Sequence, residues 1–236
     1  MKRRGFGLLV AVAAAMMAVG LWLAVTAPPD AMQGNFARIF HVHVPSAWLA
    51  FLAFGITALG SIGWLVRRTD GWDLMAESSA EIGVVFTAIA LFTGSLWGRP
   101  VWGTYWDWGD KRLASTALMF FVYLGYLALR RATPDRVQRA RRSAVLGVVA
   151  VIQVPLVYFS VDLWRTLHPK PSIRPTGATM PAEMLRAFLI NLAAFTVMYL
   201  AMLIGRMRLA RSLMAAEQQT LPAAGTAVTA PKLEAT

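Results

Sequence analysis

Residues 44–66 read VPSAWLAFLAFGITALGSIGWLV, an apolar run of 23 residues without a single charged side chain. A helix of about 20 such residues crosses the hydrocarbon core of a bilayer, because each residue adds about 1.5 Å along its axis. The whole chain has the same character, since 57% of its 236 residues are hydrophobic and only 15% are charged. Soluble domains carry about 25% charged residues. The sequence therefore predicts an integral membrane protein.

Five further apolar runs accompany this one, so we expect an all-α membrane protein with six transmembrane helices. The predicted spans are 6–26, 44–66, 82–97, 115–129, 144–161 and 184–205. The sequence MKRR before the first span is also typical of a signal peptide. That run is longer than the usual 7–15 apolar residues of a signal peptide, however, and Pro28 would follow the cleavage site, which favours an uncleaved anchor.

The basic residues are distributed unequally between the two sides of the membrane. Segments on the side of the N-terminus hold 15 of the 23 Lys and Arg residues, and segments on the other side hold eight. Because basic loops stay in the cytoplasm, both termini are predicted to be cytoplasmic. The net charge of +11 then reflects topology, and we expect no nucleic-acid partner. Residues 1–205 form the membrane domain, and 206–236 are predicted to be a disordered cytoplasmic tail.

The loop between the third and fourth spans, residues 97–113, is predicted to be external and is rich in tryptophan. Its sequence WGRPVWGTYWDWGDKR holds Trp97, Trp102, Trp106 and Trp108, with glycine and proline between them. An interfacial aromatic belt needs one or two such rings per helix end. Four rings on a turning backbone favour a platform for a flat ligand.

All three histidines lie in the predicted outer segments. His43 precedes the second span, with Pro45 in the expected first helical turn, and His168 lies in the third outer loop. His41 would point away from His43, because two helical residues differ by about 200°. A histidine at an interface is often only a surface residue. Haem, however, suits this loop, because its iron accepts imidazole and its propionates could pair with Arg99, Lys111 and Arg112.

Several motifs carry a resemblance to a known family. The stretch WGRPVWGTYWDWGDKRLAS resembles the tryptophan-rich WWD signature of the haem-handling membrane proteins of cytochrome c biogenesis. RIFHVHVPSAW, EIGVVFTAIALFTGSLWGRP and VYFSVDLWRTLHP are similar to the first outer loop, third helix and third outer loop of the cytochrome c maturation protein C family, also called haem exporter protein C. The resemblance covers about residues 30–200 in the same order.

This resemblance implies a non-covalent site for haem b at the external face, with His43 and His168 as the axial ligands of the iron. The loop platform would be formed by Trp97, Trp102, Tyr105, Trp106, Trp108, Asp107 and Asp110, with Arg99, Lys111 and Arg112 beside it. Tyr105 stands where the family often has tryptophan. Gly109 adds a residue between Trp108 and Asp110, so either Asp107 or Asp110 could take the role of the family's aspartate.

The family's activity implies delivery of haem to a membrane-anchored haem chaperone, together with an ABC-type ATPase and a second membrane subunit. The location would be the bacterial inner membrane, with the haem site facing the periplasm. The chain has no phosphate-binding G-x-x-x-x-G-K-[ST] motif, so any ATP hydrolysis belongs to a partner. We therefore expect a haem-transfer subunit more than a conventional enzyme.

Other functional classes are less compatible with the sequence. The main alternative is a WWD-type cytochrome c haem lyase, but such enzymes are typically larger and carry histidines inside the membrane. A b-type electron carrier would need histidine pairs between its spans, and a transporter would show paired broken helices. The lack of cysteine excludes disulfides, thiolate metal sites and covalent haem attachment to this chain. Glu81, at the inner end of the third span, is expected to lie at the membrane interface.

Overall fold

The computed structural model describes residues 3–169, 173–174, 177–178 and 180–220, and it has six helical segments long and apolar enough to cross a membrane. The predicted all-α membrane fold is confirmed. Five spans are single helices, namely α1 (Arg3–Thr26), α2 (Phe40–Arg67), α3 (Asp70–Trp102), α4 (Lys111–Ala132) and α7 (Ala182–Thr220). The remaining span joins α5 (Arg136–Ala150) to α6 (Gln153–Leu163). A 3-10 helix, Asn35–Ile39, precedes α2, and the short strands β1 (Ile173–Arg174) and β2 (Gly177–Ala178) pair in an antiparallel manner before α7.

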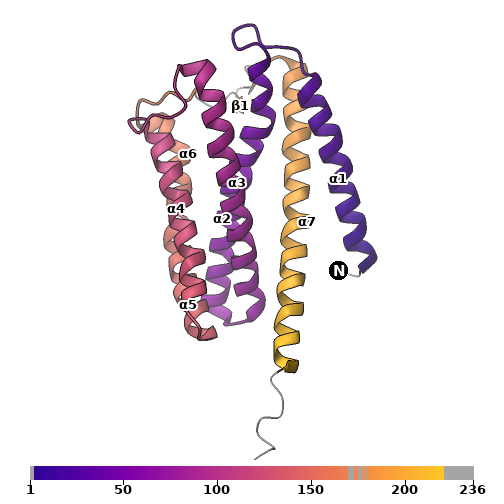
Figure 1. Cartoon of the computed structure of the whole chain (residues 1–236), viewed down its shortest axis with the longest axis vertical. Helices are drawn as coiled ribbons and strands as arrows, with labels where there is room; N and C mark the ends of the chain where they lie inside the picture. The colour runs from indigo at the N-terminus through magenta and orange to yellow at the C-terminus, as the bar shows by residue number, and fades with distance from the viewer. Residues whose placement is uncertain (1–2, 170–172, 175–176, 179, 221–236) are drawn as a thin grey trace, which may run out of the picture.

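The helices are arranged around α2 and α3, which form an antiparallel pair joined by only two residues. Arg68 takes a left-handed conformation with φ 55° and turns the chain between them. On one side lie α4, α5 and α6, and on the other side lies α7, with α1 packed outside it (Figure 1). Asn191 of α7 donates a hydrogen bond to the carbonyl of Gly20 at 2.8 Å and thereby fixes α1 to the bundle.

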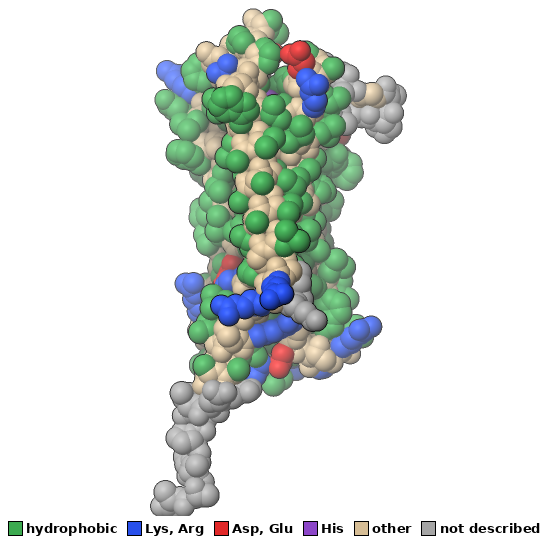
Figure 2. Space-filling model, turned by 90° about the vertical axis from the view of Figure 1, so that its right-hand side faces the viewer, with side chains coloured by type: hydrophobic (Ala, Val, Ile, Leu, Met, Phe, Trp, Pro, Cys, Tyr) green, Lys and Arg blue, Asp and Glu red, His purple; other side chains and the backbone are tan. Residues whose placement is uncertain are grey.

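The interior of the bundle immobilises α3, the helix that carries most of the residues discussed below. Phe54 of α2 stacks on Tyr123 of α4 with 3.5 Å between ring centroids. Ser79 of α3 shares a hydrogen bond of 2.7 Å with Tyr199 of α7. The visible flank of the molecule is covered by hydrophobic side chains over its middle, and Lys and Arg side chains lie toward both ends, with more of them toward the lower end (Figure 2). This distribution fits a helix bundle surrounded by lipid.

Several predicted helix limits are wrong, among them the start of α3, which lies at Asp70 and not at Ile82. The helix α2 begins at Phe40 and not at Val44, because the 3-10 helix leads directly into it, so Pro45 lies beyond the first turn. The helix α3 runs through Pro100 to Trp102 and ends where Gly103 adopts φ 78°. The fifth span is broken at residues 151–152, just before Pro155, which cannot donate a backbone hydrogen bond.

The last helix also departs from its prediction. The helix α7 continues beyond 205 to Thr220, so residues 206–220 are helical and not a disordered tail. Hydropathy falls after 205, but the arginine, leucine, methionine and alanine residues that follow are good helix formers. Contacts also hold this extension, since Arg206 pairs with Glu81 and Met214 lies 3.8 Å from the Arg136 guanidinium. Residues 221–236 of the predicted tail lie outside the described residues.

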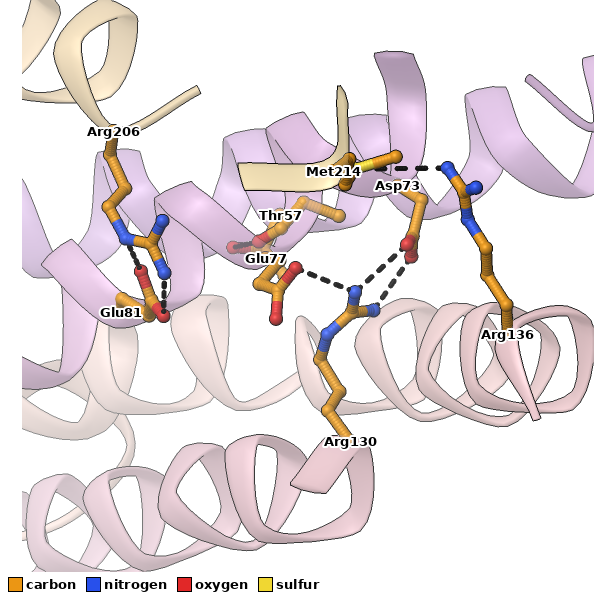
Figure 3. Close-up of polar contacts among 9 residues, drawn as sticks. Thr57, Asp73, Glu77, Glu81, Arg130, Arg136, Arg206 and Met214 are labelled. Carbon is orange, nitrogen blue, oxygen red and sulfur yellow. Dashed lines mark hydrogen bonds and ion pairs between the residues drawn. The ribbon is translucent and has the colours of Figure 1, made fainter. Parts of the chain in front are cut away.

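The N-terminal half of α3 carries acidic residues at 70, 73, 77 and 81, a spacing that places them on one face of the helix. Figure 3 shows Arg130 of α4 directed at Asp73 and Glu77, and Arg206 of α7 directed at Glu81. Arg130 of α4 binds Asp73 at 2.7 Å and Glu77 at 2.9 Å. Arg136 of α5 pairs with Asp70 at 2.9 Å, and Arg206 of α7 pairs with Glu81 at 2.6 Å. These ion pairs join four helices at the end of the bundle opposite the tryptophan-rich loop.

Candidate functional site

Three connections meet at one end of the bundle, and they hold the residues that the sequence singles out (Figure 1). They are the α1–α2 connection with its 3-10 helix, the α3–α4 loop and the segment between α6 and α7. The tryptophan-rich region is only partly a loop, because α3 includes residues 97–102 and α4 begins at Lys111. The irregular backbone is therefore limited to eight residues, 103–110, and rigid helices hold both of its ends.

His43 lies in the second turn of α2 and faces α3. Its Nδ1 is 3.1 Å from the hydroxyl of Thr93, and its ring meets the edge of Trp97 with 5.8 Å between centroids. Gly94 makes this approach possible, since a Cβ at that position would lie 2.8 Å from Cε1 of His43. The indole N–H of Trp97 donates to Gln33 at 2.9 Å. The imidazole is thus held between a hydroxyl, a glycine and an anchored indole.

His168 reaches the same region from the segment that follows α6. Its ring packs on Trp102 with 4.8 Å between centroids, and its Nδ1 lies 3.8 Å from Oδ1 of Asp110. This Nδ1 is buried and has no hydrogen-bond partner among the described residues. Burial lowers the pKa of His168 to about 4, and the positive charge of Arg112 acts in the same direction against the opposing carboxylate of Asp110. The imidazole is therefore neutral at physiological pH.

The two predicted ligand histidines, which are 125 positions apart in the sequence, lie within electrostatic range of one another. His43 is among the groups that act on His168, together with Arg112. The third histidine does not share this position. His41 is buried, with 1% of its surface exposed, and its ring packs edge-on against Phe40.

The structure assigns different environments to the two candidate aspartates. Asp110 is buried and caps α4 by accepting the backbone N–H of Leu113 at 2.9 Å. Its second oxygen accepts the backbone N–H of Leu167, the residue before His168, at 2.5 Å. Asp107 is exposed and accepts only the N–H of Gly109 within its own turn, at 2.7 Å. Of the two carboxylates, only that of Asp110 is shown next to a histidine.

The remaining aromatic residues of the predicted platform form an exposed ledge. Trp106 and Trp108 meet edge to face with 5.1 Å between centroids, and Trp108 is 69% exposed. Tyr105 is 58% exposed and lies beneath the guanidinium of Arg99, which also donates to the carbonyl of Gly103. Indole and phenol faces that remain open at a membrane surface can stack on a flat ligand.

The basic residues predicted to lie beside the platform differ in their exposure. Lys111 is exposed at the start of α4, whereas Arg112 is half-buried and within electrostatic range of Asp110 and Asp162. Arg112 also acts on His168. A cation so placed can compensate an anionic ligand beside the histidines.

Sequence reasoning did not identify Thr93, Gly94 or Gln33 as site residues. Gln33 lies in a polar loop, so only its bond to Trp97 reveals its function. Thr93 and Gly94 lie inside an apolar span, and threonine there is common because its hydroxyl can bond to the preceding turn. The sequence did contain a weak signal, because a threonine followed directly by a glycine leaves room on the surface of a helix for an imidazole or aromatic ring to pack.

The residues present fit haem in their donor chemistry. Two imidazoles with their Nδ1 atoms directed at protein groups leave their Nε2 atoms for a metal. A half-buried cation, Arg112, and open aromatic faces accompany them. Among the described residues no group of three or more His, Asp or Glu side chains could hold a bare metal ion, so a group that brings its own equatorial ligands suits the site better.

Comparison with known proteins gives consistent relatives. Residues 1–222 match the family model described as "Heme exporter protein C". The chain is 42% identical over 201 residues to the heme exporter protein C of Bradyrhizobium diazoefficiens, covering 85% of this chain and 76% of the relative. It is 35% identical over 196 residues to that of Haemophilus influenzae, covering 82% and 79%. It is also 35% identical over 181 residues to a putative cytochrome c biosynthesis ccmC-like mitochondrial protein of Marchantia polymorpha, covering 76% of each chain.

Proposed function

Because this chain belongs to the haem exporter protein C family, we propose that it binds haem b at its external end and transfers it during cytochrome c maturation. His43 and His168 are the axial ligands of the iron. The observation that carries the proposal is their convergence: two imidazoles from separate segments, each with an aromatic ring against it and with its Nδ1 at 3.1 Å or 3.8 Å from a protein oxygen. The haem would be bound without a covalent link, since the chain has no cysteine.

The surrounding residues have separate functions in this proposal. The exposed rings of Tyr105 and Trp108, with the half-buried Trp106 packed against Trp108, support the porphyrin plane, and Arg112 and Lys111 compensate the propionates. Exposed aromatic faces of this kind can hold a planar ligand while one edge of the ligand stays accessible to solvent. That accessibility suits a protein that must give its ligand to another protein.

The acceptor in this proposal is a membrane-anchored haem chaperone on the external side of a bacterial inner membrane. An ABC-type ATPase and a second membrane subunit complete the complex. The bias of 15 basic residues against eight supports an orientation with the tryptophan-rich end outside. Release of haem requires the acceptor to weaken or displace one of the two histidine ligands.

The direct test is the visible absorption spectrum of the detergent-purified protein after titration with haem. The wild type should show a spectrum of bis-histidine haem, and His43→Ala and His168→Ala should each lose it. His41→Gln is the matched control, because this buried histidine lies two positions from His43 but packs elsewhere. Its spectrum should equal that of the wild type. A wild type without bound haem, or unchanged spectra in both His43 and His168 variants, would contradict the proposal.

A second experiment separates transfer from haem lyase activity. The protein is co-expressed either with a membrane-anchored haem chaperone or with an apocytochrome that carries C-x-x-C-H. Transfer predicts haem on the chaperone and no holocytochrome when the protein acts alone. Formation of holocytochrome by this chain alone would assign it to the lyases.

A further inference from the structure

The hydrogen bonds of Thr93 define which nitrogen of His43 carries the proton. The hydroxyl of Thr93 donates to the carbonyl of Ile89, one turn earlier in α3, at 2.7 Å. A hydroxyl has a single proton, so its remaining capacity is that of an acceptor. The Nδ1 of His43 lies 3.1 Å from the same oxygen. Only an Nδ1–H can satisfy both contacts.

The packing around the ring keeps His43 in this arrangement. A Cβ at Gly94 would lie 2.8 Å from Cε1, 3.4 Å from Nδ1 and 3.7 Å from Nε2, so the Cε1 edge of the imidazole lies against α3 at this glycine. Trp97, held by its bond to Gln33, meets the ring from the external side. The ring is therefore in contact with α3 at Thr93 and Gly94 and with an anchored indole.

We propose that Thr93 is a positioning residue that holds His43 as the Nδ1–H tautomer and so presents Nε2 as the atom that binds a metal. The metal-binding part rests on the proposed haem function, whereas the tautomer is a property of the protein without its ligand. Hydrogen bonds of this kind orient ligating imidazoles and raise their basicity. The two histidines differ in this respect, because the Nδ1 of His43 contacts a hydroxyl at 3.1 Å, whereas the Nδ1 of His168 lies 3.8 Å from the carboxylate of Asp110 without a hydrogen bond.

The inference is tested on the haem-free, full-length protein in detergent. The chain has only three histidines, so the imidazole nitrogens of ¹⁵N-histidine-labelled protein can be resolved by NMR and assigned with His43→Gln. At pH 8, the wild type should show a protonated Nδ1 and an unprotonated Nε2 for His43. In Thr93→Val, which has the same shape but no acceptor, the Nδ1–H form should lose its dominance. Thr93→Ser, which restores the hydroxyl, should recover it.

Thr87→Val is the matched control. Thr87 lies in the same helix and donates to the carbonyl of Gly83 at 2.7 Å, the same backbone bond that Thr93 makes. It is buried, so its substitution removes a comparable hydroxyl, and the His43 signals should not change. A wild-type His43 protonated at Nε2, or a Thr93→Val spectrum equal to that of the wild type, would overturn the inference.

Haem titration then separates this inference from the proposed function. Thr93→Val should weaken haem binding about tenfold, the lower end of the effect typical for groups that orient metal ligands, and Thr93→Ser should bind as the wild type does. If the wild type binds no haem, the proposed function fails while the tautomer result stands. If haem binds equally well to the wild type and Thr93→Val, the positioning role is wrong even though the function holds.

Discussion

The carboxylate of Asp110 accepts the backbone N–H of Leu167 at 2.5 Å while it caps the first turn of α4. One buried side chain thus joins the start of a helix to the loop that carries His168. The segment that carries His168 is not helical at Leu167, so its position depends on such a bond. Asp110 therefore connects the tryptophan-rich region to one of the two proposed ligands.

Replacement of Asp110 by alanine should loosen that loop. The helix loses its cap, which costs about 1 kcal/mol, and Leu167 loses its acceptor. We expect faster amide hydrogen exchange at Leu167 in the haem-free protein and haem affinity reduced about 10- to 100-fold, as for other groups that support a metal ligand. Hydrogen exchange followed by mass spectrometry measures the first effect, and haem titration measures the second.

Asp107→Ala is the control for this prediction. Asp107 is exposed and bonds only to Gly109 in its own turn. We expect exchange at Leu167 to remain unchanged and haem affinity to stay close to the wild-type value. Equal losses in both variants would mean that the two aspartates act through the turn alone.

Gly94→Ala should displace His43. The new Cβ would lie 2.8 Å from Cε1 of the imidazole, closer than van der Waals contact permits, and the opposing atoms belong to a ring already in contact with Trp97. Haem affinity should therefore fall at least as much as in Thr93→Val. Gly55→Ala in α2 has open space around the added methyl and should leave haem titration unchanged. Wild-type affinity in Gly94→Ala would show that the ring does not rest on this glycine.

The sequence could predict which residues meet at the site but not how they are held. Hydropathy and the Lys/Arg bias place His43 and His168 on one side of the membrane, because both depend on properties that a single chain displays. The contact between His43 and Thr93 depends on how α2 packs on α3, which hydropathy does not encode. The sequence came closer to predicting the different environments of Asp107 and Asp110, because Asp110 stands directly before KRLAS, where a helix N-cap is expected.

Span lengths were predictable only where polar residues end the helix. The helix α1 ends at Thr26 as predicted, but α3 and α7 extend well beyond their apolar runs. In both helices the extension carries charged residues, and hydropathy predicts loops for such residues. Glu77 and Arg206 stay helical because partners on neighbouring helices pair with them.

Loss of Arg130 should destabilise the bundle more than loss of Arg136. Arg130 is 3% exposed and binds both Asp73 and Glu77, so Arg130→Ala leaves two poorly solvated carboxylates without their cation. We expect the free energy of unfolding to fall by about 3 kcal/mol. Arg136 and its partner Asp70 are 42% and 65% exposed, and Arg136→Ala should cost no more than about 1 kcal/mol. Unfolding in mixed micelles measures both values, and equal losses would contradict the assignment.

Removal of the Arg112 charge should raise the pKa of His168. Burial is the main cause of the low value, about 4, and the positive charge of Arg112 adds to it by disfavouring the imidazolium. In Arg112→Gln the pKa should therefore rise but stay below the ordinary 6.5, because burial remains. Between pH 6.5 and 4 the unfolded chain binds a proton that the folded chain excludes, so wild-type stability should fall as pH drops through this window. The pH range over which stability falls should be narrower in Arg112→Gln.

NMR titration of ¹⁵N-labelled histidine follows the pKa of His168 directly. Lys111→Gln, which changes an exposed neighbour, is the control that should leave this pKa unchanged. A His168 pKa that is equal in the wild type and Arg112→Gln would show that the guanidinium does not act on this imidazole.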